Sequence, residues 1–139
     1  MTFQLPEKKT VPEHQADAYL SQANPVSGTW YTVLDTTKNV RLLSLYATIV
    51  WTTTQPTPLE VRVTIDGQTE TFAVANPVSG TDYIGVLGYA GASYLINTFT
   101  EQRSRAFLLE GRSVKVEVRI TWATTQPTPL QCRVKYAKY

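Results

Sequence analysis

The residues best suited to catalysis or metal binding are scarce in this chain of 139 residues. It contains one histidine, His14, and one cysteine, Cys132. Nucleophilic catalysis of the Ser-His-Asp or Cys-His kind needs the histidine inside a formed pocket. A zinc site needs several His or Cys ligands. His14 lies in a segment that we expect to be an N-terminal arm, so the sequence predicts neither site, and it predicts no metal and no cofactor.

Paired carboxylates, as used in glycoside hydrolysis, are the remaining catalytic possibility. Six of the eleven acidic side chains fall either in expected turns or on the outer faces of expected strands, namely Asp35, Asp66, Glu110, Glu60, Glu70 and Glu117. Turn formation and solvation account for acids in such places. We therefore predict that the protein is not an enzyme.

Aromatic side chains are the other candidates, because amphipathic rings suit binding surfaces. Trp30, Tyr83 and Tyr89 are the candidates for facing a ligand such as a sugar, and for Trp30 a place in the core or an interface is the favoured alternative. Trp51 and Trp122 follow the inward pattern of their strands and are expected to lie in the core.

The elements that position these residues are expected to be strands. Charged residues make up 17% of the chain, below the usual share of about 25%, and helix-forming runs are scarce. The pair Asp66-Gly67 between two alternating runs is a strong signal of a two-residue hairpin. We expect strands over 29–34, 40–53, 58–65, 68–74, 81–88, 93–99, 104–109, 112–124 and 129–137.

Two segments of the chain occur twice. "WTTTQPTPLEVRV" (51–63) returns as "WATTQPTPLQCRV" (122–134), and "NPVSGTWY" (24–31) returns as "NPVSGTDY" (76–83). This order predicts one antiparallel, jelly-roll-like β-sandwich over 24–139 with an internal two-fold sequence duplication. Its halves are 24–75 and 76–139, and the second carries an insertion within 84–104. The near-identical proline loops have two open explanations, a recent duplication or equivalent contacts in a symmetric assembly.

The two halves differ on their outer faces. At an offset of 71 residues, Cys132 stands where its counterpart is Val61, so we expect it to be a buried hydrophobic residue. The outer face of the strand near 40–53 reads Leu42, Ser44, Tyr46, Thr48, Val50, whereas its counterpart reads Ser113, Lys115, Glu117, Arg119, Thr121. An antiparallel sheet commonly has one solvated face, so the apolar version is expected to be covered. The cover is the arm, the insertion or another subunit.

Residues 1–23 differ from the rest of the chain. Pro6, Pro12 and the pair Lys8-Lys9 predict an N-terminal arm, in which 12–22 could form a short helix. Such an arm is either unordered or laid on a neighbouring subunit. We therefore predict an oligomer interface made of Leu42, Tyr46 and Val50, with His14 and Tyr19 from the arm.

Charge and hydropathy place few demands on partners. Residues 1–102 carry five basic and nine acidic side chains, and residues 103–139 carry eight basic and two acidic ones. The basic third is either a solvated face or a patch for an acidic neighbour, and few aromatics accompany it, so nucleic-acid binding is not expected. No apolar run could span a membrane, and the N-terminus lacks a secretory signal, so we expect synthesis in a host cytoplasm.

Two stretches carry a resemblance to a known family type. "SGTWYTVLD" (27–35) and "AFLLEGRSVKVEVRITW" (106–122) resemble segments of phage and other viral β-sandwich structural proteins, and the resemblance extends over about 24–139. It implies a non-enzymatic capsid, decoration or tail component located in the virion. Such a component forms a homo-oligomer, with a trimer favoured, and contacts other virion subunits. The alternative is a carbohydrate- or receptor-binding module, such as a tail-fibre tip that binds a glycan receptor.

Overall fold

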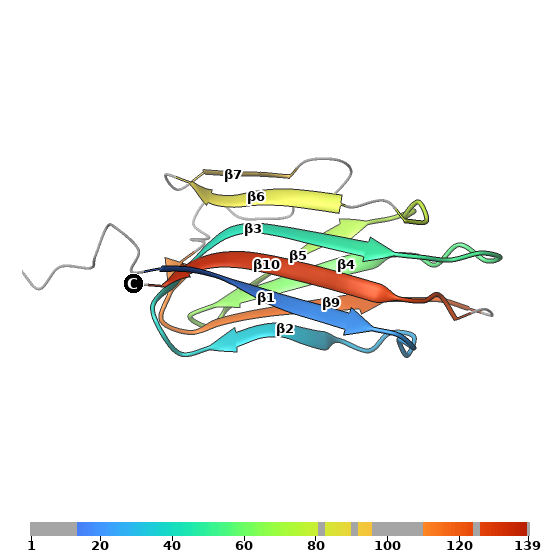
Figure 1. Cartoon of the computed structure of the whole chain (residues 1–139), viewed down its shortest axis with the longest axis horizontal. Helices are drawn as coiled ribbons and strands as arrows, with labels where there is room; N and C mark the ends of the chain where they lie inside the picture. The colour runs from blue at the N-terminus through green and yellow to red at the C-terminus, as the bar shows by residue number, and fades with distance from the viewer. Residues whose placement is uncertain (1–13, 81–82, 90–91, 96–109, 124–125, 139) are drawn as a thin grey trace, which may run out of the picture.

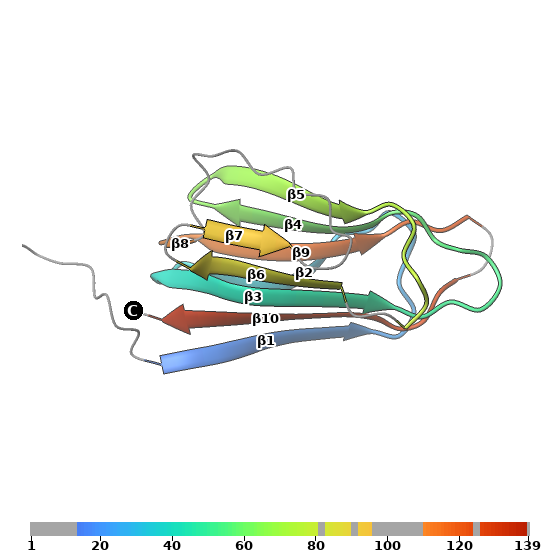
Figure 2. The same cartoon turned by 90° about the horizontal axis from the view of Figure 1, so that it is seen from above.

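The chain folds into a β-sandwich. The computed structural model describes residues 14–80, 83–89, 92–95, 110–123 and 126–138. Within these ranges the strands are β1 (His14–Gln22), β2 (Tyr31–Thr36), β3 (Val40–Ile49), β4 (Leu59–Ile65), β5 (Gln68–Val74), β6 (Tyr83–Tyr89), β7 (Ala92–Leu95), β8 (Glu110–Gly111), β9 (Val114–Ile120) and β10 (Leu130–Lys138). Figure 1 looks onto the sheet that contains β1, β10 and β3, and Figure 2 shows the molecule turned by 90°.

Two antiparallel sheets form the layers of the sandwich. Sheet A has the order β1-β10-β3-β6-β7, with the short β8 also paired to β3, and sheet B has the order β2-β9-β4-β5. The connections after β1, β3, β5 and β9 each lead from one sheet to the other. This winding of eight main strands into two sheets is that of a jelly roll. The predicted all-β, jelly-roll-like sandwich is confirmed.

The segment after residue 13 differs from the sequence prediction. Residues 14–22 form β1, which pairs with β10 along its whole length, so the predicted short helix over 12–22 is wrong for these residues. Ala18 and Leu20 pack against the core, whereas Asp17 and Tyr19 are exposed. This alternation has the period of a strand, and it outweighs the helix signal of Pro12. The prediction of an arm over 1–23 therefore stays a prediction only for residues 1–13, which lie outside the described residues.

The outer face of β3 also differs from the sequence prediction. The pairing of β3 with β10 shifts by one residue, because Ser44 faces Lys135 while Leu42 faces Tyr136. Leu43 is the extra residue of this β-bulge, which changes the face on which the earlier residues lie. Leu42 is consequently fully buried in the core and is not part of an outer surface, contrary to the prediction. Tyr46 keeps its predicted place on the outer face.

The hairpin between β4 and β5 has the predicted two-residue turn. Asp66 and Gly67 both have positive φ, at 48° and 84°, as a type I′ turn requires. The carboxylate of Asp66 accepts hydrogen bonds from the backbone N–H groups of Arg112 and Ser113, at 3.0 and 2.9 Å. The turn thus also fixes the start of β9.

The strands that carry the repeated segments take equivalent places in the two sheets. In sheet A β10 pairs with β3, and in sheet B β4 pairs with β9, with the same register of side chains. Each pair contains one strand from each predicted half, so the halves interleave. β7 lies within the segment predicted as an insertion and has no counterpart in the described part of sheet B.

The first of two equivalent end contacts joins Trp51 to the segment 76–80. The indole N–H of Trp51 donates to the carbonyl of Pro77 at 3.1 Å, and the side chain of Gln55 donates to the same carbonyl. The Ser79 hydroxyl accepts from the Trp51 backbone N–H at 3.0 Å and donates to the Trp51 carbonyl at 2.9 Å.

The second end contact repeats the first with the roles of the halves exchanged. Trp122 and Gln126 donate to the carbonyl of Pro25, at 3.0 and 3.1 Å. Ser27 makes the same pair of hydrogen bonds to the backbone of Trp122. We call the two sets the end clamps, and both lie at the end of the sandwich where the connections after β1, β3, β5 and β9 gather, on the right in Figures 1 and 2. Val26 and Val78, one in each clamp, are both 58% exposed.

Cys132 lies in the core, as predicted from its counterpart Val61, and both side chains are fully buried. Burial raises the pKa of the Cys132 thiol from its usual 9.0 to about 12. The folded protein therefore holds the neutral thiol, and the unfolded chain ionises first as the pH rises above 9, so stability is lost between pH 9 and 12.

A thiol reagent should test this burial directly. At pH 8 we expect Cys132 in the folded protein to react about a hundredfold more slowly than in the urea-unfolded chain, because the thiolate is the reactive form. The colour released from a thiol-reactive disulfide reports the rate. The variant Cys132→Val should fold with nearly unchanged stability, as Val61 occupies the matched position, and a fast-reacting folded protein would contradict the buried placement.

Candidate interaction surface

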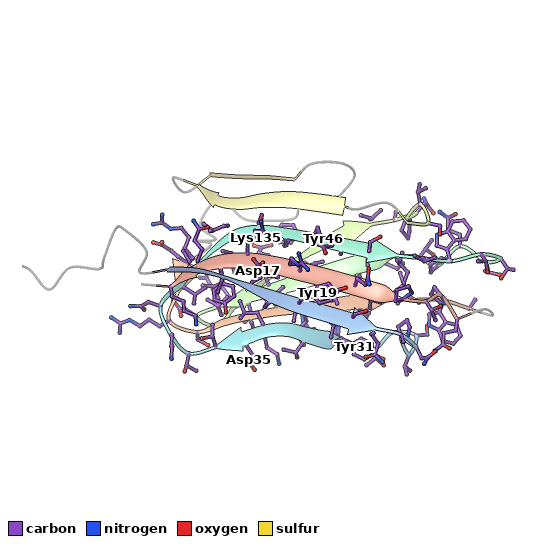
Figure 3. All side chains as sticks on the ribbon, viewed as in Figure 1. Asp17, Tyr19, Tyr31, Asp35, Tyr46 and Lys135 are labelled. Atoms are coloured by element: carbon purple, nitrogen blue, oxygen red, sulfur yellow. The ribbon has the colours of Figure 1, made fainter. Side chains whose placement is uncertain are left out.

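The outer face of sheet A carries a row of two tyrosines and an arginine. Tyr19 of β1, Arg133 of β10 and Tyr46 of β3 are directly paired across the three strands. The Arg133 guanidinium carbon lies 4.9 Å from the Tyr19 ring centroid and 5.7 Å from that of Tyr46, within the range of cation–π attraction. Figure 3 shows the two tyrosines on this face, and Tyr19 is 48% exposed. We call these three residues the tyrosine–arginine row.

The matched positions on sheet B hold ion pairs. Arg62 of β4 donates two hydrogen bonds to the carboxylate of Glu117 on β9, at 2.9 and 3.0 Å. Next to them Arg119 donates to Glu60, with a shortest distance of 2.6 Å. The Glu117 side chain is only 9% exposed, and the Lys115 ammonium lies 3.8 Å from it. Each buried charge on this face thus has an opposite charge beside it.

The same places on sheet A lack those carboxylates. In the shared register Arg133 corresponds to Arg62, but its neighbour on β3 is Tyr46 where Arg62 has Glu117. Beside them Gln131 and Thr48 stand where sheet B has Glu60 and Arg119. The Nε of Arg133 is buried without a hydrogen-bond partner among the described residues, and so is the Oγ1 of Thr48. Buried polar groups ordinarily have hydrogen-bond partners, so the outer face of sheet A lacks partners for these two atoms in the described part of the chain. We call it the incomplete outer face.

A second charged row lies beside the tyrosine–arginine row. Asp17 on β1 is paired in register with Lys135 on β10, which is paired with Ser44 on β3. Asp17 and Lys135 are both exposed on the outer face of sheet A (Figure 3). A partner that meets this face therefore encounters aromatic rings, two cations and one carboxylate.

Trp30 is placed on sheet B rather than on this face. The guanidinium carbons of Arg62 and Arg119 lie 4.1 and 4.3 Å from its ring centroid. The ring therefore packs on the ion pairs of sheet B, which accounts for it in structural terms. Tyr83 and Tyr89 are the first and last residues of β6, and their side chains lie outside the described part. The expected ligand-facing role of these three residues stays a prediction.

The structure brings together two of the five predicted interface residues, Tyr19 and Tyr46. Val50 is exposed just past the end of β3, and the backbone of His14 pairs with Lys138 near the opposite end of sheet A. Leu42 is excluded by its burial. Sequence reasoning missed Arg133 as their partner. Its signal was present in the repeat, because the two arginines match whereas Glu117 is replaced by Tyr46.

Among the described residues no three His, Cys, Asp or Glu side chains are grouped so as to hold a metal ion. The described part also has no helix that is long and apolar enough to cross a membrane. The features that remain are those of a jelly-roll sandwich with one incomplete outer face.

Comparisons with known proteins give a likeness of fold. No protein-family model and no curated protein sequence matches the chain. Among solved structures, that of infectious bursal disease virus, Gx strain, is similar with a TM-score of 0.43 and 12% identity, covering 96% of this chain and 37% of that chain. The VP2 subviral particle of the same virus gives a TM-score of 0.40 and 12% identity, covering 99% of this chain and 37% of that one. This chain thus spans little more than a third of those chains.

Proposed function

We propose that the protein is a non-enzymatic structural subunit that assembles with copies of itself through the outer face of sheet A. The carrying observation is the tyrosine–arginine row, in which Arg133 has no carboxylate partner among the described residues where the matched Arg62 has one. Tyrosine and arginine are the residue types most enriched at the energetically dominant centres of protein interfaces. A second copy supplies both aromatic area and carboxylates to such a face.

The viral part of this proposal extends the resemblance of segments 27–35 and 106–122 to phage and other viral β-sandwich structural proteins. In that setting the subunit is a capsid, decoration or tail component, and its partners are its own copies and other virion proteins. A homotrimer remains the expected oligomer for such a component. The glycan-binding alternative has no comparable support, because the Trp30 ring is already packed on two arginines.

A single substitution on the outer face of sheet A, which introduces the residue found at the matched position of sheet B, tests this contact. Tyr46→Glu places a carboxylate beside Arg133 in the geometry that Glu117 has beside Arg62, so the fold should be kept. The new carboxylate neutralises the charge of Arg133 and the change removes one of the two tyrosine rings, so the face should attract a second copy less strongly. We expect self-association to weaken about tenfold. The solution mass, measured by light scattering over a dilution series, reports the change.

The matched control is Thr71→Ala, on the outer edge strand of sheet B at the place that Tyr19 has in sheet A. Its association should equal that of the unchanged protein. A protein that stays monomeric at every concentration would overturn the proposal of self-assembly. Equal association of Tyr46→Glu and the unchanged protein would remove this face as the contact.

A further inference from the structure

Among the described strands, β1 forms one edge of sheet A and is paired on one side only, with β10. All nine of its residues face β10 in a continuous register, from His14 opposite Lys138 to Gln22 opposite Leu130. Its other side presents a row of backbone N–H and C=O groups, which is a template for pairing with a further strand.

The usual protection of an edge strand is missing from β1. Natural edges are commonly blunted by lysine, proline, a bulge or a short length. β1 contains no lysine or proline, has no register shift, and carries one acidic residue, Asp17. By contrast β2, an edge of sheet B, has six residues and a shift between Thr32 and Leu34. β5, the other edge of sheet B, also lacks lysine, proline and a register shift, but it has seven residues where β1 has nine. Among the described edges of the sandwich, β1 is therefore the longest that is open to pairing.

The core is also incomplete along this edge. Leu20 of β1 faces Cys132 just as Phe72 of β5 faces Val61 on the matched edge of sheet B. Phe72 is fully buried, whereas Leu20 and its neighbour Ala18 are only partly buried although they pack against the core. A strand added beside β1 would complete their burial, and burial of apolar area is favourable.

We propose that β1 pairs antiparallel with β1 of a second copy, about a two-fold axis at Ala18, so that sheet A continues through both molecules. The pairing rests on the proposed self-assembly and adds a second contact between copies, at the edge of sheet A. It is an isologous contact, because the same edge serves both copies. It uses the edge of sheet A and leaves the face around Tyr46 free for a different contact, as an oligomer larger than a dimer requires.

The register follows from charge and from strand length. A pairing centred on Ala18 matches all nine residues of both strands and places Asp17 of one copy opposite Tyr19 of the other. A pairing centred on Asp17 would set the two carboxylates directly opposite, which is destabilising. A pairing centred on Tyr19 would leave the first two residues of each strand without partners. A pairing shifted by one residue, with Ala18 of one copy opposite Tyr19 of the other, would put the core face of one copy on the same side of the joined sheet as the solvent face of the other.

Disulfide trapping with single cysteines tests both the contact and its register. In the Cys132→Val background, Gln15→Cys and Ser21→Cys are made separately, mixed and oxidised with glutathione disulfide. The proposed register places residue 15 opposite residue 21 of the other copy, and two residues 15 about 20 Å apart. Because a disulfide needs Cα atoms closer than about 7 Å, mass spectrometry should show the mixed dimer in at least about tenfold excess over either homodimer.

The matched control is Thr71→Cys in β5, the edge of sheet B, which should stay monomeric under the same oxidation. Equal amounts of mixed and like dimers, or trapping no better than that of Thr71→Cys, would overturn the β1 pairing. If light scattering then still shows oligomers, the proposed self-assembly stands without this strand. A monomeric Cys132→Val protein that gives no trapped dimer would overturn both.

Discussion

Replacing Arg62 by alanine is expected to destabilise the fold by about 2–3 kcal/mol, because it leaves a buried carboxylate without its partner. Glu117 is 9% exposed and receives two hydrogen bonds from Arg62, while Lys115 approaches only to 3.8 Å. Removal of the guanidinium also takes away one of the two cations that lie against the Trp30 ring. Urea unfolding followed by tryptophan fluorescence measures the loss.

The informative control is Arg133→Ala, the same change at the matched place in sheet A. No carboxylate depends on Arg133 among the described residues, so its loss should destabilise folding by less than about 1 kcal/mol. The double change Arg62→Ala with Glu117→Leu should regain most of the lost stability, since it removes the unpaired charge as well. Equal losses for Arg62→Ala and Arg133→Ala would contradict the contrast between the two faces.

Replacing either clamp tryptophan by alanine is expected to destabilise the protein by about 2–4 kcal/mol. Trp51 and Trp122 pack against the core, and each indole N–H donates to the carbonyl of a proline in the other half. The distances from the indole nitrogen to the proline carbonyl oxygen are nearly equal, at 3.1 Å for Trp51 and 3.0 Å for Trp122. Thermal unfolding of the two variants should therefore give nearly equal shifts.

Smaller changes separate the hydrogen bonds of the clamps from the packing of the rings. Ser79→Ala and Ser27→Ala each remove a hydroxyl that both accepts from and donates to a tryptophan backbone. Each should lower the stability by about 1 kcal/mol. A strong effect at one clamp and none at the other would show that the two ends are not energetically equivalent.

Much of the fold could be predicted from the sequence, because alternation and turn chemistry are local signals. The Asp66-Gly67 hairpin and the inward face of β9 follow directly from such patterns. The repeat identified Cys132 as a core residue through Val61. The expected strand over 104–109 lies outside the described residues. β1 was missed because a proline before a polar stretch suggests a helix start, and only pairing with β10 makes that stretch a strand.

The make-up of the outer face of sheet A was predictable only in part. The contrast between Tyr46 and its counterpart Glu117 is visible in the sequence, and Tyr46 lies on the outer face as predicted. The burial of Leu42 could not be predicted, because the bulge at Leu43 is set by the pairing with β10 rather than by the local sequence pattern. Arg133 was missed for a related reason, because its position between Tyr19 and Tyr46 depends on strands from distant parts of the chain.

The crosswise end clamps have a consequence for how the chain folds as it is made. Ser27 donates a hydrogen bond to the carbonyl of Trp122, 95 residues later, and the carbonyl of Pro25 accepts one from the side chain of Gln126, 101 residues later. Contacts of such long range slow folding, because the loop between them must be closed first. We therefore expect the N-terminal half not to fold stably by itself while the chain is being made. The sandwich can form only after β10 has left the ribosome, because β10 lies between β1 and β3 in sheet A. Until then β1 lacks its partner strand, and both of its edges are open to pairing.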